Sequence, residues 1–179
     1  EHITEGTITY KGEKIVNKNF KEAIQRGFGL VPESRKEQGL VQIFSVKENI
    51  CMVSMEKVIE GGVIRNSKVK EYAGEYVKKL RIATPGIDTE VQYLSGGNQQ
   101  KVVIAKWLME DCDVIILDEP TRGIDVGAKS EIYGLMTELV KKGKGVIMIS
   151  SEMPEIIGMC DNVIIMHDRR MAGKLSRKE

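Results

Sequence analysis

The chain has 179 residues, a length that suits one ordinary domain. Its net charge of +1 argues against a basic nucleic-acid-binding surface, and its 41% hydrophobic and 30% charged residues argue against a disordered chain. No apolar run approaches the roughly 18 residues of a membrane span and no signal peptide is visible, so we expect a cytoplasmic protein that meets a membrane only through a partner. Three widely spaced cysteines are expected to be buried, reduced thiols, namely Cys51, Cys112 and Cys160.

The N-terminal part is expected to contain short β elements and then helices. In chain order the pattern predicts an exposed strand, a helical turn, an apolar strand and a charged loop, at residues 7–10, 21–26, 29–31 and 33–42. Residues 45–81 show helical periodicity, and Gly61 and Gly62 divide this stretch into two or more helices.

The C-terminal half alternates between apolar strands and amphipathic helices. Strands are predicted at residues 114–117, 146–149 and 162–166, and helices at residues 98–110, 128–142 and 153–159. This alternation predicts right-handed crossovers and a parallel sheet that contains all three strands. The continuous apolar runs of the first two strands predict burial on both faces. Gly143 is expected to end the second helix in the left-handed conformation.

Two adjacent carboxylates, Asp118 and Glu119, directly follow the strand predicted at residues 114–117. Open α/β sheets bind ligands at the carboxyl edge of their strands. Asp118 is suited to hold Mg²⁺, usually through water, and Glu119 is suited to orient or deprotonate an attacking water molecule. Taken alone, the pair is equally compatible with an ordinary strand end followed by a turn.

A second candidate site is the sequence Ser95-Gly96-Gly97 before the helix predicted at residues 98–110. Ser95 is a suitable N-cap, and the two glycines allow backbone N–H groups to approach an anion at the positive end of the helix dipole. A simple capped helix would explain this motif if it stood alone.

The order and spacing of these segments resemble the ATP-binding cassette (ABC) ATPases. Residues 94–100 resemble the signature motif, residues 114–119 the Walker B strand, and residues 123–125 the D-loop. The resemblance covers essentially the whole chain and points to the second ATP-binding half of tandem bacterial importers of ribose, galactose and similar sugars. It implies an α/β, P-loop NTPase-like fold with a parallel core sheet, a small N-terminal antiparallel β part, a helical subdomain near residues 45–95 and a RecA-like core at residues 96–179.

The chain departs from the family pattern in three respects. The Walker A loop, Gly-x-x-x-x-Gly-Lys-Ser/Thr, does not occur in the sequence, so the chain resembles a partial domain that lacks the first strands and the phosphate loop. Glu33 stands where the family commonly has a glutamine that senses the metal and the transporter. Ser151 stands where the family commonly has a histidine that contacts the γ-phosphate.

The resemblance implies that ATP and Mg²⁺ lie between two such domains. It assigns catalysis to Glu119, Mg²⁺ to Asp118, and nucleotide binding to Ser95, Gly96, Gly97, Gln99, Asp125, Glu33 and Ser151. Our hypothesis is that the Ser95 segment completes the more active site, on the other ABC ATPase half. The site built on Asp118 and Glu119 would then be slower or mainly structural.

The implied function is ATP hydrolysis that energises sugar import. The implied partners are the other ATPase half, transmembrane permease subunits and a periplasmic or lipoprotein sugar-binding protein, with no nucleic acid. The protein would lie in the cytoplasm, on the inner face of the cell membrane, with a permease helix in the groove near residues 33–44. A non-transport ABC ATPase is one alternative, and a purely solvated surface is the alternative for the charged loop. The isolated 179 residues are expected to be an inactive, non-enzymatic module that does not bind ATP.

Overall fold

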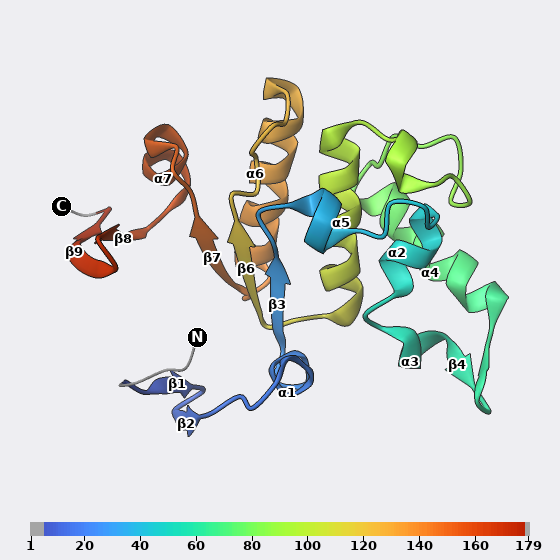
Figure 1. Ribbon diagram of the computed structural model, residues 1–179, viewed down its shortest axis with the longest axis horizontal. Coiled ribbons are helices and arrows are strands. Elements are labelled where there is room, and N and C mark those ends of the chain that lie inside the picture. Colours follow the sequence, from blue (N-terminus) through green and yellow to red (C-terminus); the bar gives the residue numbers. More distant parts are fainter. Residues whose placement is uncertain (1–5, 178–179) are drawn as a thin grey trace.

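A computed structural model describes residues 6–177. At its centre lies a parallel sheet in the order β3 (Phe28–Val31), β6 (Val114–Asp118) and β7 (Gly145–Ile149) (Figure 1). Leu117 lies opposite both Val31 and Met148 in this register. The parallel sheet is therefore confirmed, and its third strand is the one predicted at residues 29–31.

The strand predicted at residues 162–166 forms, but its expected place in the parallel sheet was wrong. This strand, β8 (Asn162–His167), pairs antiparallel with a strand that the pattern did not reveal, β9 (Arg170–Ser176). Asp168 and Arg169 connect them with φ values of +47° and +63°. Two successive left-handed residues reverse the chain directly into an antiparallel neighbour, which explains why β8 pairs with β9.

The N-terminal elements match their prediction closely. The strand β1 (Ile8–Tyr10) forms a hairpin with β2 (Glu13–Ile15), and the short helix α1 (Phe20–Gln25) follows. The Tyr10 hydroxyl donates to Asp113 at 2.9 Å, and its ring lies 4.8 Å from that of Phe28. These contacts attach the hairpin to the end of the central sheet.

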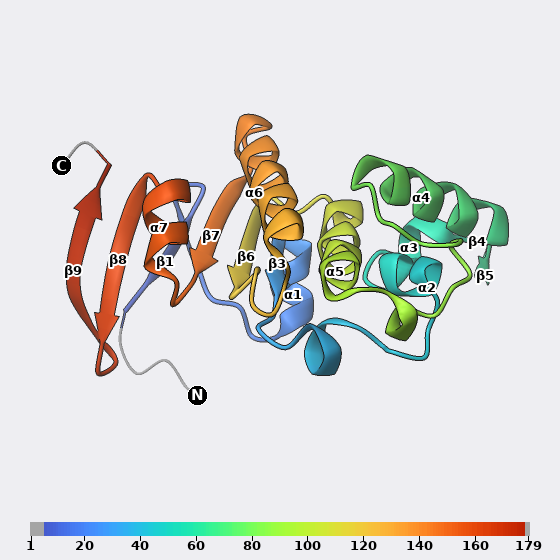
Figure 2. The ribbon, with the colours of Figure 1, turned by 90° about the horizontal axis from the view of Figure 1, so that it is seen from above.

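The region predicted as helical contains α2 (Val46–Cys51), α3 (Met55–Val58) and α4 (Asn66–Lys79), which gather at one end of the molecule (Figure 2). Between α3 and α4 lies a hairpin that the sequence pattern missed, formed by β4 (Ile59–Glu60) and β5 (Val63–Ile64). Gly61 and Gly62 both adopt positive φ at its turn. They break the helices as predicted, and their left-handed backbone also closes the hairpin.

The helix α5 (Gly96–Glu110) lies between the sheet and these helices and is buried on most of its surface (Figure 2). Two buried lysines on it have hydrogen-bond partners for their ammonium groups, and Lys101 also forms an ion pair with Glu131 at 2.5 Å. Lys106 donates to the Gly39 carbonyl at 2.5 Å, and Lys101 donates to the Arg81 carbonyl at 2.9 Å. Burial lowers the pKa of Lys106.

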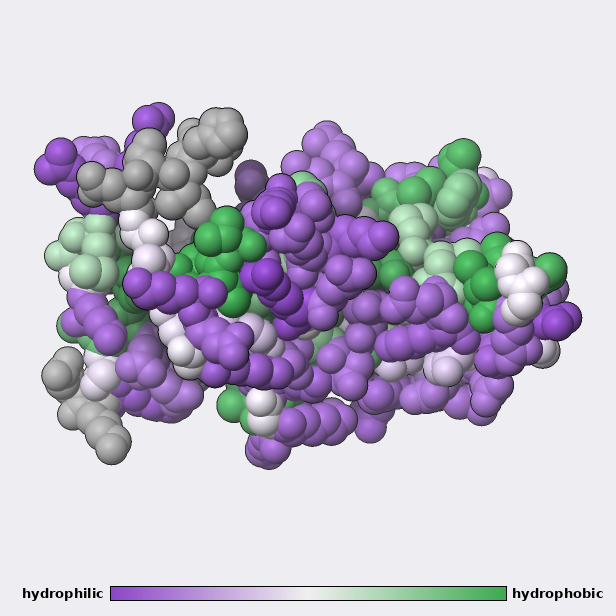
Figure 3. All heavy atoms as spheres, turned by 90° about the horizontal axis from the view of Figure 1, so that it is seen from below, coloured by the Kyte–Doolittle hydropathy of each residue, from purple (hydrophilic) through white to green (hydrophobic). Residues whose placement is uncertain are grey.

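The two faces of the central sheet differ, which corrects the expectation that its strands are buried on both. On one face Val31, Ile115 and Leu117 are at most 1% exposed. On the other face Ile147 and Ile149 are about half exposed, at 51% and 50%. Because successive side chains of a strand point to opposite faces, one face packs in the core while the other stays open. Figure 3 shows apolar surface toward the end of the molecule that carries the C-terminal hairpin and also at the opposite end.

Two further helices follow strands of the sheet, α6 (Val126–Lys141) and α7 (Met153–Met159). Gly143 ends α6 as predicted, with φ +78° and its N–H donating to the Val140 carbonyl at 2.9 Å. The Lys144 N–H donates to the Leu139 carbonyl at 3.1 Å, which completes a Schellman motif. Within residues 6–177, none of the helices combines the length and the apolar character that crossing a membrane requires.

Candidate functional site

Glu119 and Ser151, which are 32 positions apart in the sequence, meet at the carboxyl edge of the central sheet. The Ser151 N–H donates to a Glu119 carboxylate oxygen at 2.8 Å, and the Glu119 N–H donates to the Ile149 carbonyl at 2.9 Å. Glu119 adopts φ +46°, a left-handed backbone that costs about 1–2 kcal/mol for a residue with a Cβ. This conformation turns the chain sharply at the end of β6, where the two backbone contacts hold it.

Asp118 is the last residue of β6 and lies half-buried, in register with Ile149 of β7. One carboxylate at this edge suits Mg²⁺, which is commonly held by one or two carboxylates together with substrate phosphates and water. Among the described residues, no three His, Cys, Asp or Glu side chains come together to hold a metal ion. A single carboxylate at this edge is compatible with a Mg²⁺ ion whose other ligands are phosphate oxygens and water, and the metal role of Asp118 stays a prediction.

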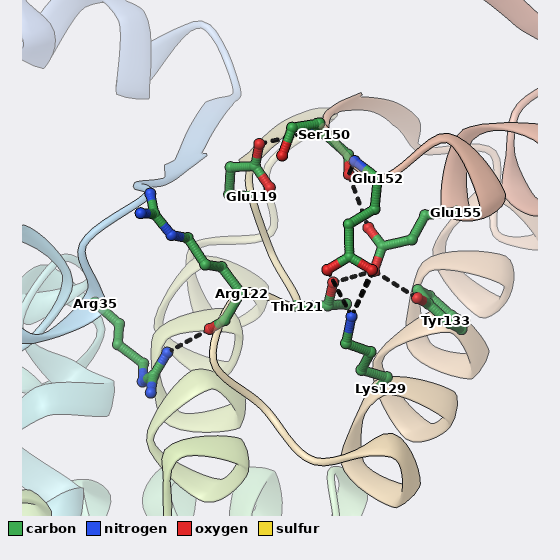
Figure 4. A network of polar contacts seen from close by, with 10 residues as sticks. Arg35, Glu119, Thr121, Arg122, Lys129, Tyr133, Ser150, Glu152 and Glu155 are labelled. Carbon is green, nitrogen blue, oxygen red and sulfur yellow. Dashed lines mark hydrogen bonds and ion pairs between the residues drawn. The ribbon is translucent and has the colours of Figure 1, made fainter.

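A buried carboxylate behind this edge, Glu155, organises the loops that follow β6 and β7 (Figure 4). Glu155 is 5% exposed and accepts hydrogen bonds from Thr121, from Tyr133 at 2.6 Å and from Ser150 at 2.9 Å. Lys129 lies 3.4 Å away. Burial raises the pKa of Glu155, but these donors and the Lys129 charge outweigh it, so the pKa is lowered overall. The sequence places Glu155 in a short helix but carries no signal that it is buried.

Ser95 is the N-cap residue of α5, as predicted, but its hydroxyl does not bind the helix backbone. It accepts instead from the side-chain amide of Asn98 at 2.9 Å. At Gly96 a side chain would require the end of Arg35 to shift, and at Gly97 it would meet the Cβ of Ala128. A Cβ on Gly96 would lie 2.6 Å from Nη2 of Arg35, and one on Gly97 would lie 2.6 Å from Cβ of Ala128. Close packing is thus one reason for these glycines, beside the anion binding that the sequence suggests.

Asp125 and Gln99, the other residues assigned to the signature and D-loop segments, make internal contacts. Asp125 is the N-cap of α6, and its carboxylate accepts from the Ala128 N–H at 2.9 Å. Gln99 is 2% exposed, and its side-chain amide donates to the Val91 carbonyl at 2.9 Å. Gln99 therefore anchors the segment before α5 in this structure, and its direct binding to a nucleotide stays a prediction.

Glu33 makes an ion pair with Arg122, in the turn that leads to Asp125. The segment after Glu33, predicted as a loop, instead contains a short π-helical turn at Arg35–Gly39. The N–H groups of Gln38 and Gly39 both donate to the Ser34 carbonyl, at 2.9 and 3.3 Å, because the chain reverses over five residues here.

The predicted site residues thus fall into two groups that the turn at residues 119–125 connects. Asp118, Glu119 and Ser151 lie at the sheet edge. A second group surrounds the start of α5 and consists of Ser95, Gly96, Gly97, Asp125 and, through Arg122, Glu33.

Comparison with known proteins gives relatives along almost the whole chain. The chain is 44% identical over 179 residues to the ribose import ATP-binding protein RbsA of Bacillus subtilis (strain 168), covering 100% of this chain and 36% of that protein. It is 50% identical over 175 residues to the xylose import ATP-binding protein XylG of Thermoanaerobacter pseudethanolicus, covering 98% of this chain and 35% of that protein. The chain therefore spans about a third of the length of these relatives.

Solved structures share the fold at lower identity. The dimeric post-hydrolysis state of the ATP-binding cassette MJ0796, bound to ADP and Pi, matches with a TM-score of 0.80 at 22% identity, covering 97% of this chain and 74% of that one. The ATP-binding cassette MJ1267 in its ADP conformation matches with a TM-score of 0.77 at 21% identity, covering 98% and 71%. This likeness concerns the fold, and confirms the expected cassette architecture. The family model described as ABC transporter matches residues 1–122, more than half of the sequence, and the chain accordingly belongs to the ABC transporter family.

Proposed function

We propose that the full-length protein containing this chain hydrolyses ATP to energise the import of a simple sugar, such as ribose or galactose. The observation that carries this proposal is the identity of 44–50%, over nearly the whole chain, to proteins named as sugar import ATP-binding proteins. The arrangement of carboxylates at the sheet edge is consistent with that activity.

Asp118 and Glu119 would serve a nucleotide bound at this chain's own sheet edge. ATP, when bound with Mg²⁺, supplies the phosphoanhydride whose cleavage releases the energy. Asp118 would provide the carboxylate for the metal, and Glu119, whose carboxylate accepts from the Ser151 N–H at 2.8 Å, would orient the attacking water. The Ser151 side chain is too short to reach as far as the histidine common in the family. We therefore propose that this site is the slower of two.

The segment Ser95-Gly96-Gly97 would complete the other, more active site, on a nucleotide held by the second ATPase half. Its support is the N-terminal position of these residues on the 15-residue helix α5. Backbone N–H groups and the helix dipole favour an anion at such a helix start.

The permease subunits would contact the surface near residues 33–44. Three large apolar side chains are exposed in or near this segment, with Ile43 70%, Phe44 40% and Tyr93 74% exposed. Exposed apolar side chains close together are typical of protein interaction surfaces. In this proposal the protein works at the cytoplasmic face of the membrane, and a sugar-binding protein outside the cell membrane delivers the substrate.

Substitution in the full-length protein tests the assignment of the two sites. We expect Ser95→Ala to lower ATP turnover more strongly than Glu119→Gln, because Ser95 belongs to the more active site. Ser130→Ala, at an exposed position of α6, is the matched control and should leave turnover unchanged. If Glu119→Gln stops turnover while Ser95→Ala is silent, the assignment is reversed. Absence of any sugar-dependent ATP turnover in the complete complex would overturn the proposed function itself.

For the 179 residues in isolation we propose a folded module without ATPase activity. The observation that favours this is the absence of a Walker A sequence, which ordinarily supplies the backbone N–H groups and the lysine around the phosphates. We expect calorimetric titration with Mg-ATP to give no saturable binding in the micromolar range. A micromolar Kd would contradict this description.

A further inference from the structure

Two side chains from the segment 33–35 bind the turn at residues 122–123. Glu33 pairs with the side chain of Arg122, while the Arg35 guanidinium donates to the Arg122 carbonyl at 2.9 Å and to the Gly123 carbonyl at 3.5 Å. Ser34, between them, is extended with φ −92° and ψ 91°. Side chains two residues apart on an extended chain point to the same side, so both reach the same turn. We call this set of contacts the clasp.

Arg35 also contacts a third segment, the start of α5. Its Nη2 atom lies 2.6 Å from where a Cβ on Gly96 would stand, and the Gly123 carbonyl lies 3.4 Å from the same point. The guanidinium thus fills the space beside Gly96 that any other residue would need. One side chain therefore joins the segment 33–39, the turn at residues 122–123 and the start of α5.

The base of the clasp is attached to the interior of α5. Gly39, at the end of the π-helical turn, lies against Val103, and its carbonyl accepts from the buried Lys106 at 2.5 Å. Its N–H donates to the Ser34 carbonyl, beside Arg35. Arg35 near one end and Gly39 at the other therefore bond this segment to its neighbours, the turn at residues 122–123 and α5.

We propose that Arg35 is a positioning residue that couples the segment 33–39 to the start of α5 and to the turn that carries Asp125. A partner that pushes on this segment would then move Ser95, Gly96, Gly97 and Asp125 as one unit. The use of the clasp in regulation rests on the proposed function, whereas the coupling between the segments does not.

Amide hydrogen exchange in the full-length protein tests the coupling. The Ile124 N–H donates to the Thr121 carbonyl at 3.3 Å and reports on the order of the turn. Arg35→Ala should raise its exchange rate about tenfold, the scale of a lost hydrogen bond from a charged donor. Arg122→Ala is the matched control, since it removes the ion pair with Glu33 but keeps both main-chain acceptors of Arg35. An unchanged rate in Arg35→Ala, or an equal rise in Arg122→Ala, would overturn the proposal.

A second substitution separates positioning from a general loss of structure. Gly96→Ala places a methyl group against Arg35 and should raise Ile124 exchange in the otherwise natural protein. In the Arg35→Ala background the obstacle is gone, so Gly96→Ala should add little. If Gly96→Ala raised Ile124 exchange by the same factor in both backgrounds, the two substitutions would act independently, and this would contradict the role of Arg35.

ATP turnover of the complete complex distinguishes the regulatory use from the proposed function. If the natural protein shows sugar-stimulated turnover, Arg35→Ala should reduce the stimulation to less than half of the natural value. Arg35→Lys should give a stimulation between those of Arg35→Ala and the natural protein. Raised Ile124 exchange with unchanged stimulation would overturn the regulatory use. If the natural protein has no turnover, the proposed function fails, and the exchange measurements still decide whether Arg35 couples the segments.

Discussion

The backbone N–H of Ser151, and not its side chain, holds the carboxylate of Glu119 at 2.8 Å. The Ser151 side chain is exposed, and the residue belongs to the loop between β7 and α7. Any residue except proline at position 151 can make this contact, because only the main chain donates. This separates the orientation of Glu119 from the chemistry that residue 151 supplies.

The first prediction follows from that separation. In the full-length protein carrying Ser95→Ala, in which the more active site is impaired, Ser151→His should raise the remaining ATP turnover about tenfold by adding a positioned polar group near the phosphates. Steady-state phosphate release measures it. Ser151→Ala is the control and should change neither turnover nor the free energy of unfolding by more than about 0.5 kcal/mol. A silent Ser151→His would mean that this edge binds no nucleotide in a reactive geometry.

The second prediction concerns the left-handed backbone of Glu119 at φ +46°. Glu119→Gly should be more stable than Glu119→Ala by about 1 kcal/mol, because glycine adopts positive φ without steric cost. Urea unfolding of the two variants measures the difference. At Glu138, an exposed position within α6, the glycine variant should instead be less stable than the alanine variant, since alanine is favoured in a helix. Equal signs at both positions would show that strain at Glu119 is not significant.

The third prediction concerns the buried carboxylate of Glu155. Glu155→Gln should lower the free energy of unfolding by about 2–3 kcal/mol near pH 7, because it removes the negative charge that Thr121, Tyr133 and Ser150 stabilise and replaces one of the two accepting oxygens by an NH2 group, which only donates. It also removes the weaker of the two ion pairs of Lys129, which lies 3.4 Å from Glu155 and 2.7 Å from Glu152. Chemical denaturation measures this loss. Glu138→Gln, at an exposed position, is the control and should cost less than about 0.5 kcal/mol.

The stability difference between the natural protein and Glu155→Gln should depend on pH in a predictable direction. The folded pKa of Glu155 is lowered below the ordinary value of 4.5. The ionised carboxylate therefore makes its full contribution to the free energy of unfolding above pH 4.5, and this contribution is lost as the pH falls through the folded pKa. The difference in unfolding free energy between the natural protein and Glu155→Gln should therefore shrink below about pH 4.5. A difference that stays constant or grows on acidification would contradict the lowered pKa.

The fourth prediction concerns the contact between the start of α5 and α6. Gly97→Ala should destabilise the protein by about 1–3 kcal/mol, because its Cβ would lie 2.6 Å from Cβ of Ala128. Ala128→Gly opens the space, so it should recover part of that loss in the double variant. Thermal unfolding of the four proteins gives the coupling. Gly134→Ala, where a Cβ meets no atom within 4 Å, should instead stabilise the helix by about 0.5–1 kcal/mol.

Local patterns were sufficient to predict most elements. The helix predicted at residues 153–159 has those bounds. The side-chain caps were missed: Asn19, Ser45 and Asp125 cap helices, whereas the hydroxyl of the candidate Ser95 makes no bond to its helix backbone. Hairpins were less visible, because the strands of the pair at Gly61 and Gly62 are two residues long and carry too little alternation to detect.

Neighbouring residues were enough to predict most turns, the helical segments and the motifs that identify the family, because these features depend on local sequence. Long-range packing accounts for three features that local sequence did not reveal: β8 lies outside the parallel sheet, one face of β7 stays open, and Glu155 is buried. It also brought Arg35 to the carbonyl of Arg122, a contact between residues 87 positions apart. Such contacts depend on which surfaces pack together, and a single residue's chemical type does not specify its distant neighbour.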